Sequence, residues 1–101
     1  MAKNAKSRNE FRKKNTKDGR GHPTYIYCER GNQYDYLSLT HSETTRNEKN
    51  IPLKKNPNPK DRRQTYVRPK AETAHVSSFG KRLLGWFFSD DDKETVNKLK
   101  K

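Results

Sequence analysis

The sequence GHPTYIYCERGNQYDYLSLTHS, residues 21–42, is the one stretch that reads as a complete structural unit. Two runs rich in Tyr, Ile, Leu and Thr flank Gly31-Asn32, which is the composition of a β-hairpin with a tight turn. The alternation of side chains predicts strands over residues 24–29 and 34–40. Because a hairpin brings its open ends together, residue 22 should lie beside residues 40–42.

The open end of this predicted hairpin carries side chains that can do chemistry. His22 precedes the first strand, and Thr40, His41 and Ser42 close the second. A histidine can act as a general acid or base near neutral pH, because its ordinary pKa is about 6.5. The same residues are also typical of a polar strand start and a polar strand exit, and the residue types alone do not separate these two interpretations.

The charge of the chain favours a polyanionic partner. Lys and Arg total 24 against 12 Asp and Glu, which gives a formal net charge of +12. Such a surface binds nucleic acid by neutralising phosphates, and RNA is favoured here over DNA. A solvated basic surface or an acidic protein partner is the alternative.

The sequence also limits the compartment and the size of the core. Cys28 is the single cysteine, so no intrachain disulfide forms. We find no segment resembling a signal peptide and no run of about 20 apolar residues, and we expect a cytoplasmic protein without a membrane partner. Only 27% of the residues are hydrophobic, which is close to the composition of disordered chains.

These limits predict two parts, a flexible basic arm over residues 1–20 and one small domain over residues 21–101. The arm carries eight Lys or Arg and, after Met1, one large apolar side chain, Phe11. Such an arm can lie along phosphates, or it can be a solubilising tail without a specific role.

Within the domain, alternation places Ile26, Cys28, Leu37 and Leu39 on the expected core face, with the tyrosines half-buried or exposed. Two Asn-Pro steps predict a rigid, exposed, basic loop over residues 54–63. Further strands are expected over residues 64–68 and 75–79. The apolar run over residues 83–88 supplies core candidates, which are Leu83, Leu84, Trp86, Phe87 and Phe88.

The end of the chain has the clearest helix signal, over residues 90–100. Ser89 is a good N-cap, and the acidic residues 90–92 lie at the positive end of the helix dipole. That position explains the acidic triplet without a metal, and we expect neither a metal nor another cofactor.

A binding surface can also be drawn from the aromatic and basic residues. Bases could stack on tyrosines of the hairpin while cations hold the backbone. The candidate binding residues are Arg20, Tyr25, Tyr27, Tyr34, Tyr36, Lys54, Lys55, Arg62 and Arg63. Ordinary cross-strand pairing that stabilises the hairpin explains the tyrosines equally well.

Residues 19–99 resemble the MazF/PemK-like toxins, a family of small SH3-like barrels that includes ribosome-independent endoribonucleases. The resemblance is carried by Pro23, by the turn over residues 31–34, by Leu39-Thr40 and by Ile51-Pro52. It implies a small SH3-like or PemK-like barrel with a C-terminal helix. The family's first strand has no apolar counterpart here, and the predicted disordered basic arm stands in its place.

The resemblance also implies a site. The family's catalytic arginine falls at His22, and Thr40 matches its catalytic threonine. A histidine at this position is compatible with cleavage by altered chemistry, in which His41 or His75 would be a second proton-transfer group, and equally with lost cleavage.

We therefore expect an RNA-binding protein of the toxin–antitoxin type, either a metal-independent endoribonuclease or a binder only. The resemblance implies an acidic antitoxin and a homodimer. The alternative is a non-catalytic accessory protein of a mobile element or phage.

Overall fold

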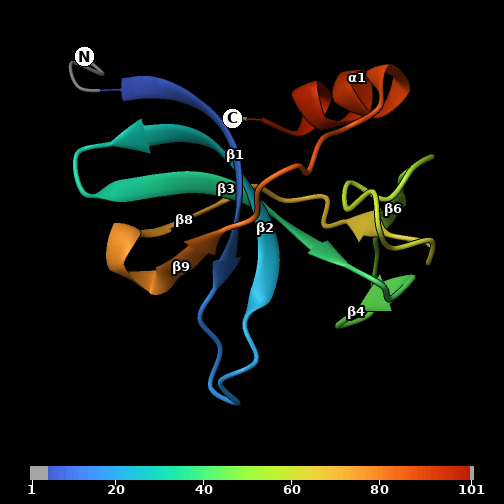
Figure 1. Ribbon diagram of the computed structural model, residues 1–101, viewed down its shortest axis with the longest axis horizontal. Coiled ribbons are helices and arrows are strands. Elements are labelled where there is room, and N and C mark those ends of the chain that lie inside the picture. Colours follow the sequence, from blue (N-terminus) through green and yellow to red (C-terminus); the bar gives the residue numbers. More distant parts are fainter. Residues whose placement is uncertain (1–4, 101) are drawn as a thin grey trace.

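The computed structural model describes residues 5–100 and consists mainly of an antiparallel sheet with one C-terminal helix (Figure 1). The strands are hydrogen-bonded in the order β6–β7–β3–β2–β1–β9, and β8 also pairs with β3. A short hairpin of β4 and β5 stands apart from this sheet. The elements are β1 (Ala5–Lys14), β2 (His22–Arg30), β3 (Gln33–Thr40), β4 (Thr44–Thr45), β5 (Glu48–Lys49), β6 (Ile51–Pro52), β7 (Tyr66–Val67), β8 (Glu72–His75), the 3₁₀ helix η1 (Val76–Ser78), β9 (Phe79–Arg82) and α1 (Asp90–Leu99).

The predicted hairpin of residues 21–42 is confirmed by β2 and β3. The turn lies at Gly31-Asn32, and Gly31 has a φ of +58°, a left-handed conformation that glycine adopts without strain. The strands are longer than predicted by one or two residues at three of their four ends.

The prediction of a disordered basic arm is wrong for residues 5–14. They form β1, an inner strand of the sheet that pairs with β2 on one side and β9 on the other. Phe11 is buried in the core opposite Tyr25. A cationic sequence can form an inner strand because the backbone supplies the ladder hydrogen bonds, while long Lys and Arg stems lie over the apolar surface. Residues 1–4 of the predicted arm lie outside the described residues.

A buried glutamate pairs with the arginines of β1. The Glu10 side chain is 4% exposed, and its carboxylate accepts hydrogen bonds from Arg8 Nη1 at 2.7 Å and Arg12 Nε at 2.9 Å. Arg82 Nε of β9 lies 3.7 Å from the same carboxylate. This cluster joins β9 to β1 by charge as well as by the ladder.

Both faces of the hairpin are buried, which corrects the prediction of a single core face. Leu37 and Leu39 pack with Tyr25 and Tyr27 in one cluster, whereas Ile26 packs in a second. The second cluster contains Tyr34, Tyr36 and Phe79. A register shift between Ile26 and Cys28 interrupts the simple alternation of β2. All four hairpin tyrosines are at most 8% exposed, so the expectation of an exposed stacking surface is wrong.

The second half of the chain completes the sheet. The strand predicted over residues 64–68 is present as β7, while the one predicted over residues 75–79 is replaced by β8, η1 and β9. β8 pairs with the first half of β3 and β7 with its end. Although η1 joins β8 directly to β9, no ladder between those two strands closes the sheet within residues 5–100.

The segment before α1 packs only in part. Phe88 is buried and Leu83 and Trp86 are partly buried, but Leu84 is 78% and Phe87 44% exposed. These two core predictions are wrong because Gly85, with a φ of +81°, turns the chain outward between them.

The predicted helix is confirmed as α1, with Ser89 as its N-cap. The Ser89 hydroxyl accepts from the Asp92 backbone N–H, and Val96 fixes the helix to the core. Within residues 5–100, no helix is long and apolar enough to cross a membrane.

Candidate functional site

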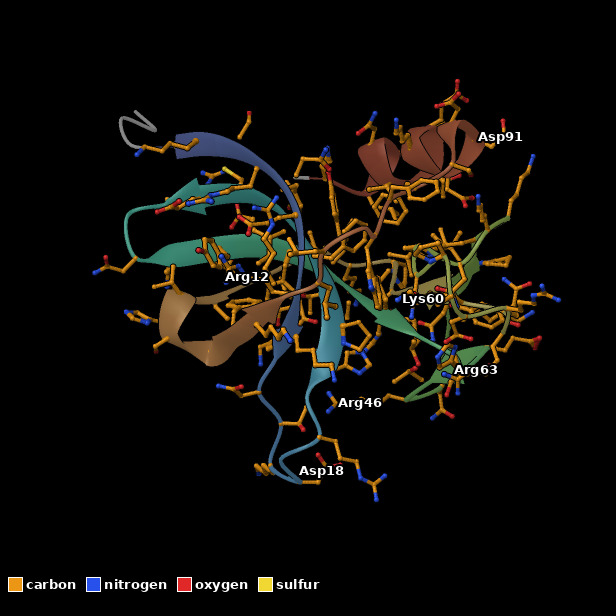
Figure 2. The ribbon with its side chains drawn as sticks, viewed as in Figure 1. Arg12, Asp18, Arg46, Lys60, Arg63 and Asp91 are labelled. Atoms are coloured by element: carbon orange, nitrogen blue, oxygen red, sulfur yellow. The ribbon has the colours of Figure 1, made fainter. Side chains whose placement is uncertain are left out.

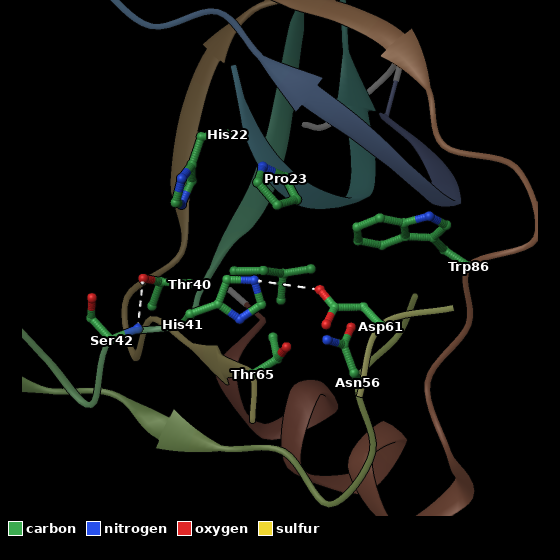
Figure 3. Close-up of a pocket in the computed structure, with 10 residues that line it drawn as sticks. His22, Pro23, Thr40, His41, Ser42, Asn56, Asp61, Thr65 and Trp86 are labelled. Atoms are coloured by element: carbon green, nitrogen blue, oxygen red, sulfur yellow. Dashed lines mark hydrogen bonds and ion pairs between the residues drawn. The ribbon is translucent and has the colours of Figure 1, made fainter. Parts of the chain in front are cut away.

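A pocket of about 310 Å³ lies at the open end of the β2–β3 hairpin (Figure 3). His22 and Pro23 enter from the start of β2, and Thr40 comes from the end of β3. The full lining is His22, Pro23, Leu39, Thr40, His41, Ser42, Asn56, Asp61, Thr65 and Trp86. The predicted proximity of residue 22 to residues 40–42 is therefore confirmed.

His22 is partly buried at the wall of this pocket. Its burial, together with the positive charges of Arg68, His41 and Lys14, holds the pKa of His22 below the ordinary 6.5. The imidazole is therefore neutral near pH 7 and has a nitrogen lone pair that can accept a proton or hydrogen bond.

The His41 ring faces a carboxylate on the other side of the pocket (Figure 3). Its Nε2 lies 3.7 Å from Asp61 Oδ2, and its Nδ1 lies 3.2 Å from the Gln64 carbonyl oxygen (Figure 3). Hydrogen bonds from Arg63 hold the pKa of Asp61 well below its usual range, so Asp61 is ionised. When His41 is protonated, this arrangement forms an ion pair that orients the ring.

Two threonine hydroxyls add hydrogen-bonding capacity. Thr40 Oγ1 accepts from the Ser42 backbone N–H at 3.1 Å, so its own proton is free to be donated elsewhere. Thr65 is buried, yet its Oγ1 has no hydrogen-bond partner among residues 5–100. A buried polar atom without a partner is uncommon in folded proteins and marks a place where a ligand can be held.

The loop over residues 54–63 forms the opposite wall and is fixed by backbone hydrogen bonds. Asp92 of α1 is buried and accepts from the backbone N–H groups of Lys54 at 2.8 Å and Lys55 at 3.0 Å. The Asn56 side chain accepts from the Asn58 backbone N–H at 2.9 Å. The loop is basic, as predicted, and these hydrogen bonds hold it so that Asn56 and Asp61 lie in the pocket.

Sequence reasoning missed four lining residues, which are Asn56, Asp61, Thr65 and Trp86. Asp61 lies in the sequence KDRR and was read as part of a basic loop. Its position two residues before Arg63 allows the side-chain hydrogen bonds that keep it ionised, which was the available signal. Trp86 was assigned to the core because its neighbours are apolar.

Several predicted site residues lie elsewhere. His75 pairs with Gln33 at the opposite end of β3, seven residues or roughly 23 Å from Thr40 at about 3.3 Å per residue. It caps η1 and bonds to Ser77, so it is not a second proton-transfer group of this pocket. Arg20 is exposed in the turn between β1 and β2, whose tip carries Asp18 (Figure 2).

The predicted basic residues of the loop lie next to the pocket. Lys54, Lys55 and Arg62 line a shallow groove that shares Asn56 and Asp61 with the pocket wall. Arg63 is exposed on the same loop (Figure 2), but its guanidinium is paired to Asp61 at 2.8 Å. Three of the four loop cations predicted to bind nucleic acid thus line the groove beside the site.

No protein-family model matches this chain, and no curated protein or solved structure matches it significantly. The resemblance to the MazF/PemK-like toxins therefore rests on the quoted sequence motifs.

Proposed function

We propose that this protein binds single-stranded RNA and cleaves it in the pocket at the open end of the β2–β3 hairpin, without a metal. One observation carries the proposal: two histidines from different segments line one pocket, His22 neutral and His41 beside the ionised Asp61. Such a pair supplies the base and the acid that transfer of an RNA phosphate to its own 2′-oxygen needs.

In the proposed reaction, His22 accepts the proton of the ribose 2′-hydroxyl. The 2′-oxygen then bonds to phosphorus as the bond to the 5′-oxygen of the next nucleotide breaks. Protonated His41 gives its proton to that leaving oxygen. The products are a 2′,3′-cyclic phosphate and a free 5′-hydroxyl, and each proton transfer is typically worth about 10²- to 10⁴-fold in rate.

The charge around His22 suits the phosphate. Lys14 pairs with His22 across β1 and β2, and the positive charges of Lys14 and Arg68 act on the His22 ring. The Thr40 hydroxyl lines the pocket and can donate to a phosphate oxygen, and the nearby positive charges of Lys14 and Arg68 would favour the negative charge that develops there. The groove cations Lys54, Lys55 and Arg62 would hold the neighbouring backbone.

The strand arrangement supports a PemK-like assignment within this proposal. β1 supplies the first strand, for which the sequence has no apolar counterpart. The strands pair in the order β8–β3–β2–β1–β9, and η1 joins the two end strands, β8 and β9. We propose that this sheet is a partly open SH3-like barrel. On that assignment, an acidic antitoxin is the expected protein partner.

Incubation of the purified protein with a long single-stranded RNA in EDTA tests the proposal. We expect discrete fragments ending in a 2′,3′-cyclic phosphate, with cleavage reduced about 10²- to 10⁴-fold in His22→Ala and in His41→Ala. His75→Ala is the matched control and should cleave normally, because His75 lies at the other end of β3.

Intact RNA with a salt-sensitive gel shift would overturn the catalytic step and leave an RNA-binding protein. Absence of both cleavage and binding would overturn the proposal and favour an acidic protein partner.

A further inference from the structure

A second pocket, of about 430 Å³, lies between β1, α1 and the segment that precedes α1. It shares one residue with the histidine pocket, which is Trp86. The indole of Trp86 therefore stands between the two pockets. An RNA strand with a phosphate at His22 would reach this second pocket after passing Trp86.

The inner surface of the second pocket is aromatic. The Phe11 ring lies 5.7 Å from that of Trp86 and 5.0 Å from that of Phe88, measured between centroids. The Tyr25 ring contacts Phe88 edge to face at 4.8 Å. Phe87, which is 44% exposed, stands at the outer edge of the pocket. Phe11, Tyr25 and Phe88 are at most 6% exposed, so they fix the floor of the pocket, and the rings that a flat apolar ligand can reach are those of Trp86 and Phe87.

The rim of the second pocket is cationic and carries amide groups. Arg8, Lys93 and Lys100 line it, and Lys100 Nζ lies 5.6 Å from the centroid of the Tyr25 ring. Asn9 of β1 and Asn97 of α1 also line it, and both side chains are exposed. An amide presents a donor and an acceptor together, as the edge of a nucleobase does.

We infer that this second pocket binds an unstacked nucleobase of the RNA strand that is cleaved at His22. This inference deepens the proposed function and rests on it. Trp86 and Phe87 give the base a stacking surface, the asparagine amides contact its edge, and the lysines hold the flanking phosphates. The combination of rings, amides and cations fits a nucleotide better than an acidic peptide, because an acidic side chain has no ring to stack on the aromatic residues.

Trp86 is the one tryptophan of the chain, so its fluorescence reports directly on this region. The probe is a short single-stranded oligoribonucleotide carrying 2′-O-methyl groups, which has no 2′-hydroxyl to attack the phosphate. We expect saturable quenching of Trp86. An abasic residue at one position of the probe should weaken binding by about 5- to 150-fold, the range for losing one base–aromatic stack.

Variants separate this pocket from the histidine pocket. Lys93→Ala should weaken binding of the probe several-fold, whereas Lys98→Ala, which removes the same charge from α1 outside the pocket, should change it less. Asn97→Ala should weaken the intact probe but leave the abasic probe unchanged. His75→Ala, which lies at the other end of β3, should bind the intact probe and quench Trp86 as the unsubstituted protein does.

Two results distinguish the failure of this inference from the failure of the proposed function. If unmodified RNA is cleaved, but every abasic probe binds as well as the intact one, the inference is wrong and the proposed function stands. If the probe shows the expected base dependence but unmodified RNA stays intact, the base pocket stands and cleavage is wrong. If no probe binds at physiological salt and unmodified RNA stays intact, both are wrong.

Discussion

The two ends of the β2–β3 hairpin differ in whether their buried polar groups have hydrogen-bond partners. At the closed end, the buried carboxylate of Asp35 accepts from Arg30 at 2.9 Å and from the Thr73 hydroxyl at 2.8 Å. At the open end, His22 is partly desolvated and the buried Thr65 hydroxyl has no partner within residues 5–100. The closed end is built for stability, and the open end leaves hydrogen-bonding capacity for a ligand.

Glu10 and Asp92 follow the pattern of the closed end although they lie on other elements. Each is a buried carboxylate with several donors, Glu10 from arginine side chains and Asp92 from backbone N–H groups. These acids join segments distant in the sequence. The buried acids with hydrogen-bond partners therefore stabilise the fold, whereas the polar groups of the histidine pocket do not.

The largest expected change in stability is that of Glu10→Gln. Removing this charge leaves three arginines around a buried neutral side chain and should lower the free energy of unfolding by roughly 3 kcal/mol. This is the low end for a broken buried ion pair, because the partner arginines stay partly hydrated. Urea unfolding measures the effect, and Glu43→Gln, at an exposed position, is the control.

A change below about 1 kcal/mol in Glu10→Gln would mean that the cluster is a surface feature. The satisfied acids would then not be what holds β1 in the sheet.

A smaller loss is expected for Asp92→Asn, which tests an acid that supports the pocket. One oxygen of the side chain becomes an NH₂ group, so one of two backbone N–H groups in the 54–63 loop loses its acceptor. We expect a loss of about 2 kcal/mol in the free energy of unfolding, within the range for hydrogen bonds to charged groups.

Amide hydrogen exchange at Lys54 and Lys55 should speed up in Asp92→Asn. The neighbouring Asp91→Asn changes an exposed acid that pairs only with the Lys54 side chain, and should shift stability by at most about 0.5 kcal/mol. Equal effects of the two variants would argue against a special role for Asp92.

Thr65→Val is expected to stabilise the fold, in contrast to the two preceding substitutions. The unpartnered hydroxyl is removed without a change of shape, so the free energy of unfolding should rise by about 1 kcal/mol. RNA cleavage should fall at the same time if this hydroxyl serves a ligand. Thermal unfolding and the cleavage assay measure the two effects, with the exposed Thr44→Val as control. A loss of stability would show that the hydroxyl is satisfied in solution.

The smallest effect is the pH dependence caused by His22. Its pKa is below 6.5 in the folded protein, so the unfolded chain binds more protons just below pH 6.5. This contribution to stability is present above pH 6.5 and is lost as the pH falls towards the folded pKa. The slope cannot exceed about 1.4 kcal/mol per pH unit for one proton.

Comparison of His22→Gln with His75→Gln over pH 5–8 isolates this contribution in urea unfolding. The slope should decrease in His22→Gln and remain larger in His75→Gln. Equal slopes in the two variants would contradict the desolvation of His22.

The hairpin and the helix were predictable because their signals are local. Gly31-Asn32 specifies the turn, and Ser89 caps the helix from its own hydroxyl. β1 was missed because Phe11 is its one large apolar side chain, and the partners that neutralise Glu10 include a residue 72 positions away. Part of the site was predictable for the same reason as the hairpin, since the open ends of paired strands must meet.

The sequence by itself determined the turn and pairing of the β2–β3 hairpin and the cap of α1, and it placed His22 beside Thr40. Only the tertiary structure decided that Asp61 faces His41, that the Thr65 hydroxyl has no partner within residues 5–100 and that Trp86 separates two pockets. The physical reason is range. Turn and capping preferences act over a few residues, whereas burial, pKa and pocket shape depend on segments that the chain brings together only after it has folded.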